Sequence, residues 1–215
     1  MILKIHGTAF TTCTKRVVLI CKEKQIPYEL HPVNLQKGEH KLPPHTDFQP
    51  FGQVPYIDDD GFILYESRAI CRYLAKKYAD QGTPGLVPTD PQAEALFEQG
   101  VSIELQSFDP YAVGICVEKV FNGYRGIPTN EERVQELLEK LRAKIDVYEV
   151  ILGKQKYIGG NQLTLADLFH IPYAFLMQSV GFEVVFVNDS HPNVARWWTE
   201  ISSRPAWLAV KDGAA

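Results

Sequence analysis

The segment Phe51–Ile70, with the sequence FGQVPYIDDDGFILYESRAI, constrains the fold of this chain more than any other. Val54–Pro55 opens its first strand, and because proline has no N–H to donate, such a strand starts at a sheet edge or a special turn. Asp58–Gly61 is a turn signal between two short apolar runs. Glu66–Ser67 then precedes apolar residues at helical spacing, and a helix N-terminus can bind an anion. The segment therefore predicts an exposed strand edge beside a carboxylate site.

The composition argues against several classes of protein. With 215 residues, the chain is long enough for one large domain or two small ones. A net charge of −4 without a long basic run argues against a nucleic-acid partner. No apolar run reaches the roughly 18 residues that would cross a bilayer, and the N-terminus lacks the pattern of a signal peptide. The 4 cysteines form no CxxC pair and no metal-ligand spacing, so we expect no membrane, no metal and a reduced, cytoplasmic protein.

The first part of the chain alternates between strand and helix patterns. Apolar alternation and helical spacing predict the following elements. The strands are at 2–6, 27–33, 56–57 and 62–64, and the helices are at 11–24 and 67–78. The segment 35–48 between them is expected to be irregular because Pro43–Pro44 interrupts it. This order, βαβ followed by ββα, predicts a thioredoxin-like α/β domain, which by itself fixes no function.

A stretch rich in proline and glycine at residues 81–91 is predicted to be a linker. Beyond it, the spacing of apolar residues predicts only helices, at 92–116, 129–152, 164–181 and 191–203, apart from one candidate strand at 183–187. We therefore predict an α/β domain at 1–80 and an all-α domain at 92–215. Thr164 and Asp167 form a capping box at a helix start, which we interpret as structural.

The QVP sequence at 53–55 and the ESRAI sequence at 66–70 together resemble the glutathione-binding half of the cytosolic glutathione transferases, most of all the phi class. The resemblance implies the glutathione transferase fold, in which a thioredoxin-like N-terminal domain with a cis-proline precedes an all-α C-terminal domain. It also implies a homodimeric detoxification enzyme that conjugates its cosubstrate, glutathione, to small hydrophobic electrophiles. Glutathione peroxidase activity is an additional expectation.

The resemblance places the catalytic hydroxyl four residues after Gly7, where phi enzymes usually carry serine and this chain carries Thr11. A hydroxyl that donates to sulfur at a helix N-terminus would stabilise the thiolate of glutathione. Because the extra methyl group of threonine restricts χ1, Thr12 and Cys13 stay open as alternative contacts to the sulfur. Helix capping is the simpler role for the same threonines.

The resemblance also assigns residues to the rest of glutathione. His40 and Lys41, in the sequence GEHK, would bind the glycine carboxylate, although a solvated basic loop is the simpler interpretation. The strand edge at Val54 would pair with the cysteinyl unit, as in β-augmentation, and the γ-glutamyl end would lie at the start of the following helix. The predicted set is His40, Lys41, Gln53, Val54, Pro55, Glu66 and Ser67.

The electrophile pocket is expected between the two domains. Its apolar candidates, for each of which core packing is an equally good explanation, are Phe10, Leu35, Phe108, Tyr111 and Ile115. Two other functions stay open. The same fold occurs in non-catalytic glutathione-binding and regulatory proteins, and the exchange of serine for threonine is compatible with that. In other transferase classes a cysteine in the first loop forms a mixed disulfide with glutathione, so a Cys13-dependent thiol reductase is the second alternative.

Overall fold

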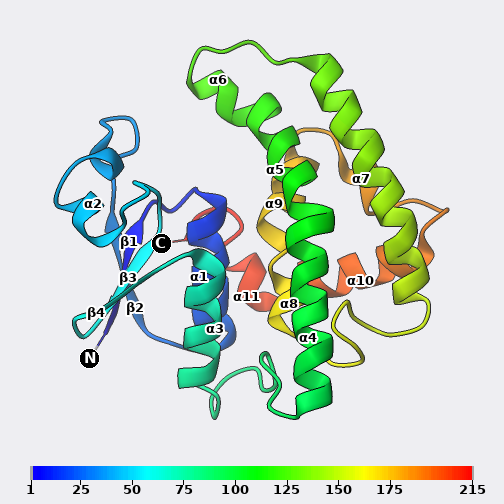
Figure 1. Cartoon of the computed structure of the whole chain (residues 1–215), viewed down its shortest axis with the longest axis horizontal. Helices are drawn as coiled ribbons and strands as arrows, with labels where there is room; N and C mark the ends of the chain where they lie inside the picture. The colour runs from blue at the N-terminus through cyan, green and yellow to red at the C-terminus, as the bar shows by residue number, and fades with distance from the viewer. Residues whose placement is uncertain (1, 215) are drawn as a thin grey trace. The chain divides into compact units, whose positions relative to one another are not determined.

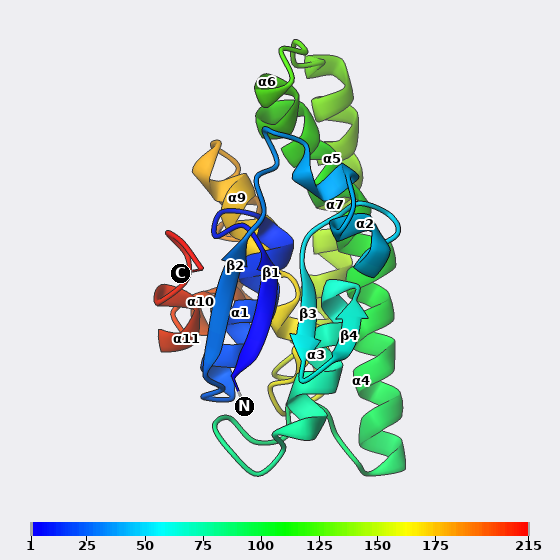
Figure 2. The same cartoon turned by 90° about the vertical axis from the view of Figure 1, so that its left-hand side faces the viewer.

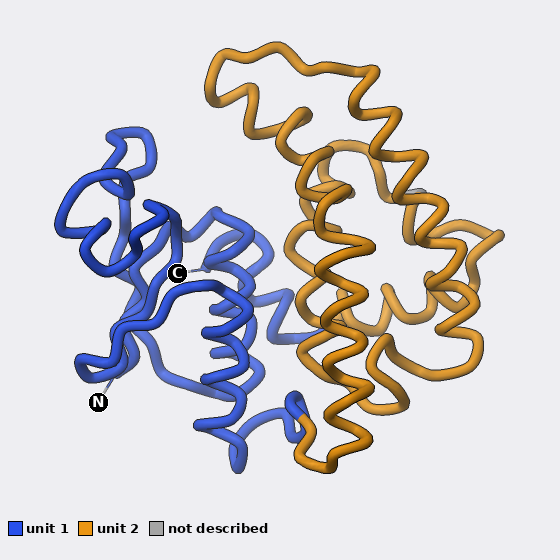
Figure 3. Tube along the Cα trace, in the orientation of Figure 1, with its two compact units in different colours: residues 1–87, 204–215 blue, residues 88–203 orange. Residues whose placement is uncertain are grey.

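The computed structural model describes residues 2–214, except for the side chain of residue 184. The chain forms two compact units (Figure 3): unit 1 comprises residues 1–87 and 204–215, and unit 2 comprises residues 88–203. The predicted division assigned everything after the linker to one domain. The structure differs from that prediction at the C-terminus, because the segment from residue 204 onward returns to unit 1.

Unit 1 is built on a four-stranded mixed sheet with the strand order β2-β1-β3-β4 (Figures 1 and 2). Its strands are β1 (Leu3–Gly7), β2 (Tyr28–Pro32), β3 (Tyr56–Asp59) and β4 (Phe62–Tyr65). β1 is parallel to β2, whereas the β1–β3 and β3–β4 pairs are antiparallel. A parallel pair needs a long crossover connection, and helix α1 supplies it. The predicted thioredoxin-like order is confirmed.

Helices α1 (Thr12–Glu23) and α3 (Ser67–Lys77) cover one face of this sheet (Figure 2). Leu3 and Ile5 alternate with outward residues along β1, as the pleat of a strand requires, and both are buried. Gly7 ends the strand so close to α1 that a Cβ atom there would come within 2.6 Å of Thr14 Oγ1. Glycine at this position therefore lets the first turn of α1 lie directly against the end of β1.

The segment 35–48, which was expected to be irregular, contains two short elements. These are a 3₁₀ turn at Glu39–Lys41 and the helix α2 (His45–Phe48). Side chains of single short turns carry little periodicity, so the pattern of apolar residues could not reveal either of them.

The C-terminal segment, which includes α11 (Pro205–Leu208), is held in unit 1 by partly buried polar contacts. Arg204 donates through Nε to Glu23 Oε1 at 2.5 Å and through Nη2 to Glu23 Oε2 at 2.7 Å. The hydroxyl of Tyr28 donates to the carbonyl oxygen of Ala214 at 3.0 Å. These partners are far apart in the sequence, which is why the boundary at residue 204 was not predicted.

The regular elements of unit 2 are all helical among the described residues. Two π-helical segments, Glu104–Phe108 and Val117–Phe121, join its first three helices end to end. The helices are α4 (Pro91–Ile103), α5 (Asp109–Cys116), α6 (Asn122–Tyr124), α7 (Glu131–Leu152), α8 (Leu165–Leu168), α9 (Ile171–Ser179) and α10 (Pro192–Ser202). The candidate strand at 183–187 is wrong, because Glu183–Val185 forms a 3₁₀ turn that lets Phe186 pack into the helical core.

The capping box at the start of α8 is present. The Asp167 carboxylate accepts hydrogen bonds from the N–H of Thr164 at 3.0 Å, the N–H of Ile158 at 2.9 Å and Trp197 Nε1 at 3.0 Å. Asp167 is fully buried, and this burial raises the pKa of its carboxyl group. One carboxylate thus joins a helix start, a loop and α10, which fits the structural interpretation.

Candidate active site

The register of the strands brings three loops of unit 1 together at one end of the sheet, which we call the loop end. His6 of β1 pairs with Tyr56 of β3, and Tyr56 in turn pairs with Tyr65 of β4. The loop that follows β1, the segment that precedes β3 and the residues that follow β4 therefore start side by side. Most of the predicted glutathione residues, and Thr11, belong to these three segments.

Thr11 is the N-cap residue of α1, yet its side chain does not cap the helix. Its Oγ1 instead donates to Thr14 Oγ1 at 2.7 Å and lies 3.2 Å from the carbonyl oxygen of Thr8. Thr14 is fully buried, whereas Thr11 is partly exposed. The sequence left two roles open for Thr11, helix cap and thiolate donor. In the structure its hydroxyl is held by Thr14 and does not cap α1, so the cap role does not apply.

The two alternatives to Thr11 lie on the first turn of α1. Thr12 is buried, which leaves little of its side chain to reach a ligand. Cys13 is half-buried and free, and its Sγ lies 3.7 Å from Arg16 Nη1. Accessibility therefore favours Thr11 and Cys13 over Thr12 as contacts to a bound thiol.

The Val54–Pro55 peptide bond is cis, as the resemblance implies. Val54 directly precedes β3, and neither its N–H nor its C=O is hydrogen-bonded to the backbone of another described residue. Backbone polar groups in folded proteins normally have partners. An extended peptide that pairs with Val54 would supply them, as in β-augmentation.

The backbone of Gln53, the residue before Val54, is fixed by two buried side chains of the preceding segment. His45 donates through Nε2 to the Gln53 carbonyl oxygen at 2.7 Å, and the Gln53 N–H donates to Gln49 Oε1 at 3.2 Å. His45 and Gln49 are buried, while Gln53 is exposed. Sequence reasoning missed both supporting residues, since His45 lies in the segment 35–48 that was expected to be irregular and Gln49 directly follows it.

Glu66 and Ser67 stand at the start of α3, and neither side chain caps it. Glu66 is exposed and has φ 70° and ψ 106°, a conformation that is rare for a residue other than glycine. Such strained backbone concentrates at ligand-binding sites. Ser67 is buried, and its Oγ accepts a hydrogen bond from Arg16 Nη1 at 3.0 Å. The simpler interpretation of both residues as caps therefore does not fit the structure.

His40 and Lys41 lie in a 3₁₀ turn that packs against the segment before β3. Lys41 Nζ donates to the Phe51 carbonyl oxygen at 3.1 Å. Gly52, at φ 61°, approaches so closely that a Cβ atom would come within 2.8 Å of the His40 carbonyl oxygen. Burial, together with the charges of Lys41 and His45, lowers the pKa of His40. This shift favours the neutral form of the His40 ring.

The structure divides the apolar candidates for the electrophile pocket. Phe108 and Ile115 are fully buried in the core of unit 2, where Phe108 packs on His170 with ring centroids 4.8 Å apart. Their burial does not fit the expected role, because a side chain without exposed surface has none to offer a ligand. Helical spacing identified an apolar face correctly but could not show that protein covers it. Phe10 is 74% exposed, and Leu35 and Tyr111 are partly exposed.

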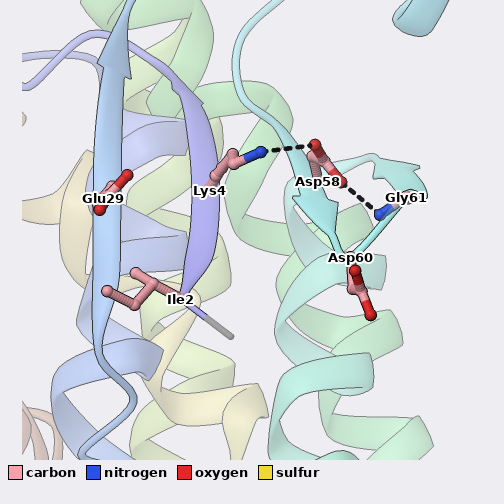
Figure 4. Close-up of a pocket in the computed structure, with 6 residues that line it drawn as sticks. All are labelled: Ile2, Lys4, Glu29, Asp58, Asp60 and Gly61. Atoms are coloured by element: carbon pink, nitrogen blue, oxygen red, sulfur yellow. Dashed lines mark hydrogen bonds and ion pairs between the residues drawn. The ribbon is translucent and has the colours of Figure 1, made fainter.

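A separate hollow of about 450 Å³ lies at the other end of the sheet. Figure 4 shows its lining, in which Lys4 donates to Asp58 at 3.4 Å and Asp58 accepts from the Gly61 N–H. These groups satisfy one another, so we do not assign the hollow a ligand. Among residues 2–214, no cluster of three or more His, Cys, Asp or Glu side chains is placed to hold a metal ion. No helix in that range is long and apolar enough to cross a membrane.

Comparisons with known proteins agree with this geometry. The family models for the glutathione S-transferase N-terminal domain and C-terminal domain match residues 10–77 and 109–205, respectively. The chain is 48% identical over 198 residues to glutathione S-transferase PM239X14 of Arabidopsis thaliana, which covers 91% of this chain and 89% of that protein. It is 42% identical to a glutathione S-transferase of Hyoscyamus muticus, with 95% of each chain covered.

Solved structures give the same result. Glutathione transferase F7 of Populus trichocarpa superposes with a TM-score of 0.94 at 34% identity, with 100% of both chains covered. Glutathione S-transferase I from maize, solved with an atrazine glutathione conjugate, gives a TM-score of 0.90 at 31% identity and covers 99% of this chain and 97% of its own. The chain belongs to the glutathione S-transferase family. Within that family it is similar to the plant phi-class enzymes, and it is an enzyme that uses glutathione as its cosubstrate.

Proposed function

We propose that the enzyme transfers the thiolate of glutathione to small hydrophobic electrophiles. Unit 1 is proposed to bind the tripeptide at the loop end of its sheet, where the loop after β1, the segment before β3 and the residues after β4 meet. The observation that carries this assignment is that the backbone N–H and C=O of Val54 have no backbone partner among the described residues, and that Val54 lies at the same end of the sheet as Glu66–Ser67. A peptide paired with Val54 would direct its γ-glutamyl carboxylate to the N-terminus of α3. Lys41 would supply the positive charge for the carboxylate at the other end.

Thr11 is proposed as the catalytic residue. An unperturbed thiol has a pKa of about 8.5, and lowering it by about two pKa units requires about 2.7 kcal/mol of additional thiolate stabilisation. A hydrogen bond to a charged group contributes roughly 1.5–3 kcal/mol, and the N-terminus of α1 adds favourable potential. One hydroxyl at this position can therefore account for the shift. A protein general base is not required, since the electrophile brings its own leaving group or acceptor.

The exposed Phe10 and the partly exposed Leu35 of unit 1 are proposed as contacts of the electrophile. Tyr111 of unit 2 is partly exposed and is kept as a separate candidate. The maize relative was solved with a glutathione conjugate of atrazine, which supports an activated aryl halide as the first substrate to test. Turnover with an aryl halide and with an organic hydroperoxide measures the transferase and the peroxidase activities separately. We expect aryl-halide turnover, and activity with the hydroperoxide alone would contradict the proposed conjugation.

Binding of glutathione can be tested without turnover. Addition of glutathione near pH 7 should produce the ultraviolet absorbance of a thiolate, and the protein should be retained on a glutathione resin. Neither signal depends on the choice of electrophile. If both are absent, unit 1 has the scaffold of a transferase but not the proposed tripeptide site.

Thiol reductase activity through Cys13 is a second candidate, supported by the accessibility of this free, half-buried cysteine on the first turn of α1. Cys13→Ser should then abolish reduction of a mixed disulfide of glutathione while leaving aryl-halide conjugation intact. Unchanged reductase activity in this variant would exclude the second candidate.

We also propose a cytoplasmic homodimer. Besides Phe10, unit 1 exposes Phe48 at 41%, Phe51 at 65% and Phe62 at 49%, and apolar surface of this kind is typical of protein interfaces. The 4 cysteines of the chain are free, which suits a reducing compartment. Sedimentation equilibrium should give twice the chain mass, and Phe51→Ala should shift the protein towards the monomer. A monomeric wild-type protein would contradict the proposed dimer.

A further inference from the structure

Arg16 has a role in this site that the proposed catalytic steps do not use. It lies on α1 and is only 1% exposed. One of its hydrogen bonds goes to Ser67, the first residue of α3. This contact places the guanidinium at the helix start where the ligand carboxylate is proposed to bind.

The direction of the hydrogen bond between Arg16 and Ser67 is unambiguous. Arg16 Nη1 lies 3.0 Å from Ser67 Oγ, and both side chains are buried. A guanidinium has only donors, so Ser67 Oγ must be the acceptor. The single proton of the Ser67 hydroxyl therefore points to some other acceptor. Ser67 is the first residue of α3 and not its N-cap, which is Glu66, and the hydrogen bond recorded for its hydroxyl is the one from Arg16.

We infer that Arg16 is a positioning residue for the γ-glutamyl α-carboxylate of glutathione. It holds Ser67 so that the hydroxyl donates to that carboxylate, and it places a positive charge behind the contact. Both effects favour an anionic acceptor, since hydrogen bonds to charged groups are the stronger ones. The inference rests on the proposed function, which places this carboxylate at Ser67.

Removing Arg16 should therefore weaken binding of one chemical group of the ligand and not of the whole tripeptide. The probe is γ-aminobutyryl-cysteinyl-glycine, which differs from glutathione only in lacking the γ-glutamyl α-carboxylate. Calorimetric affinities for glutathione and for this analogue should be compared in wild type, Arg16→Gln and Ser67→Ala. We expect Arg16→Gln to weaken glutathione binding about tenfold or more, and to change the affinity for the analogue by less than about twofold.

The same variant should raise KM for glutathione without changing the pKa of the bound thiol. In the double variant with Ser67→Ala, the loss of glutathione affinity should be clearly smaller than the product of the two single losses, because the two residues act on one carboxylate. Arg72→Gln is the matched control. It removes the same charge from unit 1, but from a partly exposed position on α3, and should leave both affinities unchanged.

The outcomes separate this inference from the proposed function. If Arg16→Gln weakens both ligands equally, its role is in the fold, and the inference is overturned. If Ser67→Ala discriminates between the ligands and Arg16→Gln does not, only the inference is overturned. If Ser67→Ala leaves both affinities unchanged, the proposed carboxylate site itself is wrong. Should Arg16→Gln not fold, Arg16→Lys carries the test: it keeps the charge but not the reach, and a loss specific to glutathione is still expected.

Discussion

Replacing Thr11 by alanine removes the hydroxyl that is proposed to hold the glutathione thiolate. In the structure, the Thr11 oxygen is held 2.7 Å from the buried Thr14 Oγ1 and 3.2 Å from the Thr8 carbonyl oxygen. Its one proton is donated to Thr14 and must turn to the sulfur when glutathione binds. A charged hydrogen bond contributes roughly 1.5–3 kcal/mol, and one pKa unit corresponds to about 1.36 kcal/mol. Thr11→Ala should therefore raise the pKa of the bound thiol by about one to two pKa units.

This shift predicts a particular dependence of rate on pH. If the wild-type thiol has a pKa of about 6.5, half of it is ionised at that pH, against about 1–10% in the variant. Aryl-halide turnover should then fall by about 5- to 50-fold near pH 6.5. The deficit should disappear near pH 9.5, because the thiol is ionised there in both proteins.

The assay is a titration of the thiolate absorbance of bound glutathione, together with kcat/KM as a function of pH. Thr11→Ser keeps the hydroxyl and should keep the low pKa, while Thr12→Ala tests the buried alternative and should change little. Full activity of Thr11→Ala with an unchanged thiol pKa would refute the assignment. A deficit that persists at high pH would show that Thr11 acts on something other than ionisation.

Three further predictions concern stability and can be checked by urea unfolding. Asp167→Ala should lower the free energy of unfolding by about 2–4 kcal/mol, because it removes a cap and leaves the Trp197 indole N–H without its acceptor; glutathione affinity of the folded protein should not change. Arg204→Ala should cost about 3–5 kcal/mol, since it leaves the buried Glu23 carboxylate unpaired; a cost below about 1 kcal/mol would show that the C-terminal contact is weak. Burial lowers the pKa of His6 below its usual 6.5, so the unfolded state binds more protons below that pH, and stability should fall as pH drops from about 6.5. His6→Phe should reduce this dependence of the unfolding free energy on pH, and an unaltered dependence would show that other groups cause it.

The sequence predicted the segment Phe51–Ile70 well because its signals are local. A proline before a strand, an acidic turn ending in glycine and an apolar helical repeat each act on near neighbours, and all three occur where expected. The order of strands and helices along unit 1 was also predicted correctly. The detailed role of Ser67 did not, because a serine at a helix start reads as a cap and its actual partner lies elsewhere in the chain.

The missed contacts share one physical cause, which is distance along the chain. Arg16 and Ser67 are 51 positions apart, and Glu23 and Arg204 are 181 positions apart. Periodicity reports which side of a helix is apolar, but it does not report what covers that side. The same gap explains Phe108, which spacing placed on an apolar face and which the structure places in the core.

The supporting side chains also explain how unit 1 can hold the tripeptide independently of the electrophile. Each of the three segments at the loop end of the sheet is fixed by a buried polar partner within unit 1, so the geometry of these segments does not depend on the bound electrophile. The pairs are Thr11 with Thr14, Gln53 with His45, and Ser67 with Arg16. Substitutions at the buried members should therefore change the affinity for glutathione or the pKa of its thiol, and leave the relative rates with different electrophiles unchanged. Substitutions at Phe10 should do the reverse, because its side chain is 74% exposed and offers apolar surface instead of a polar contact.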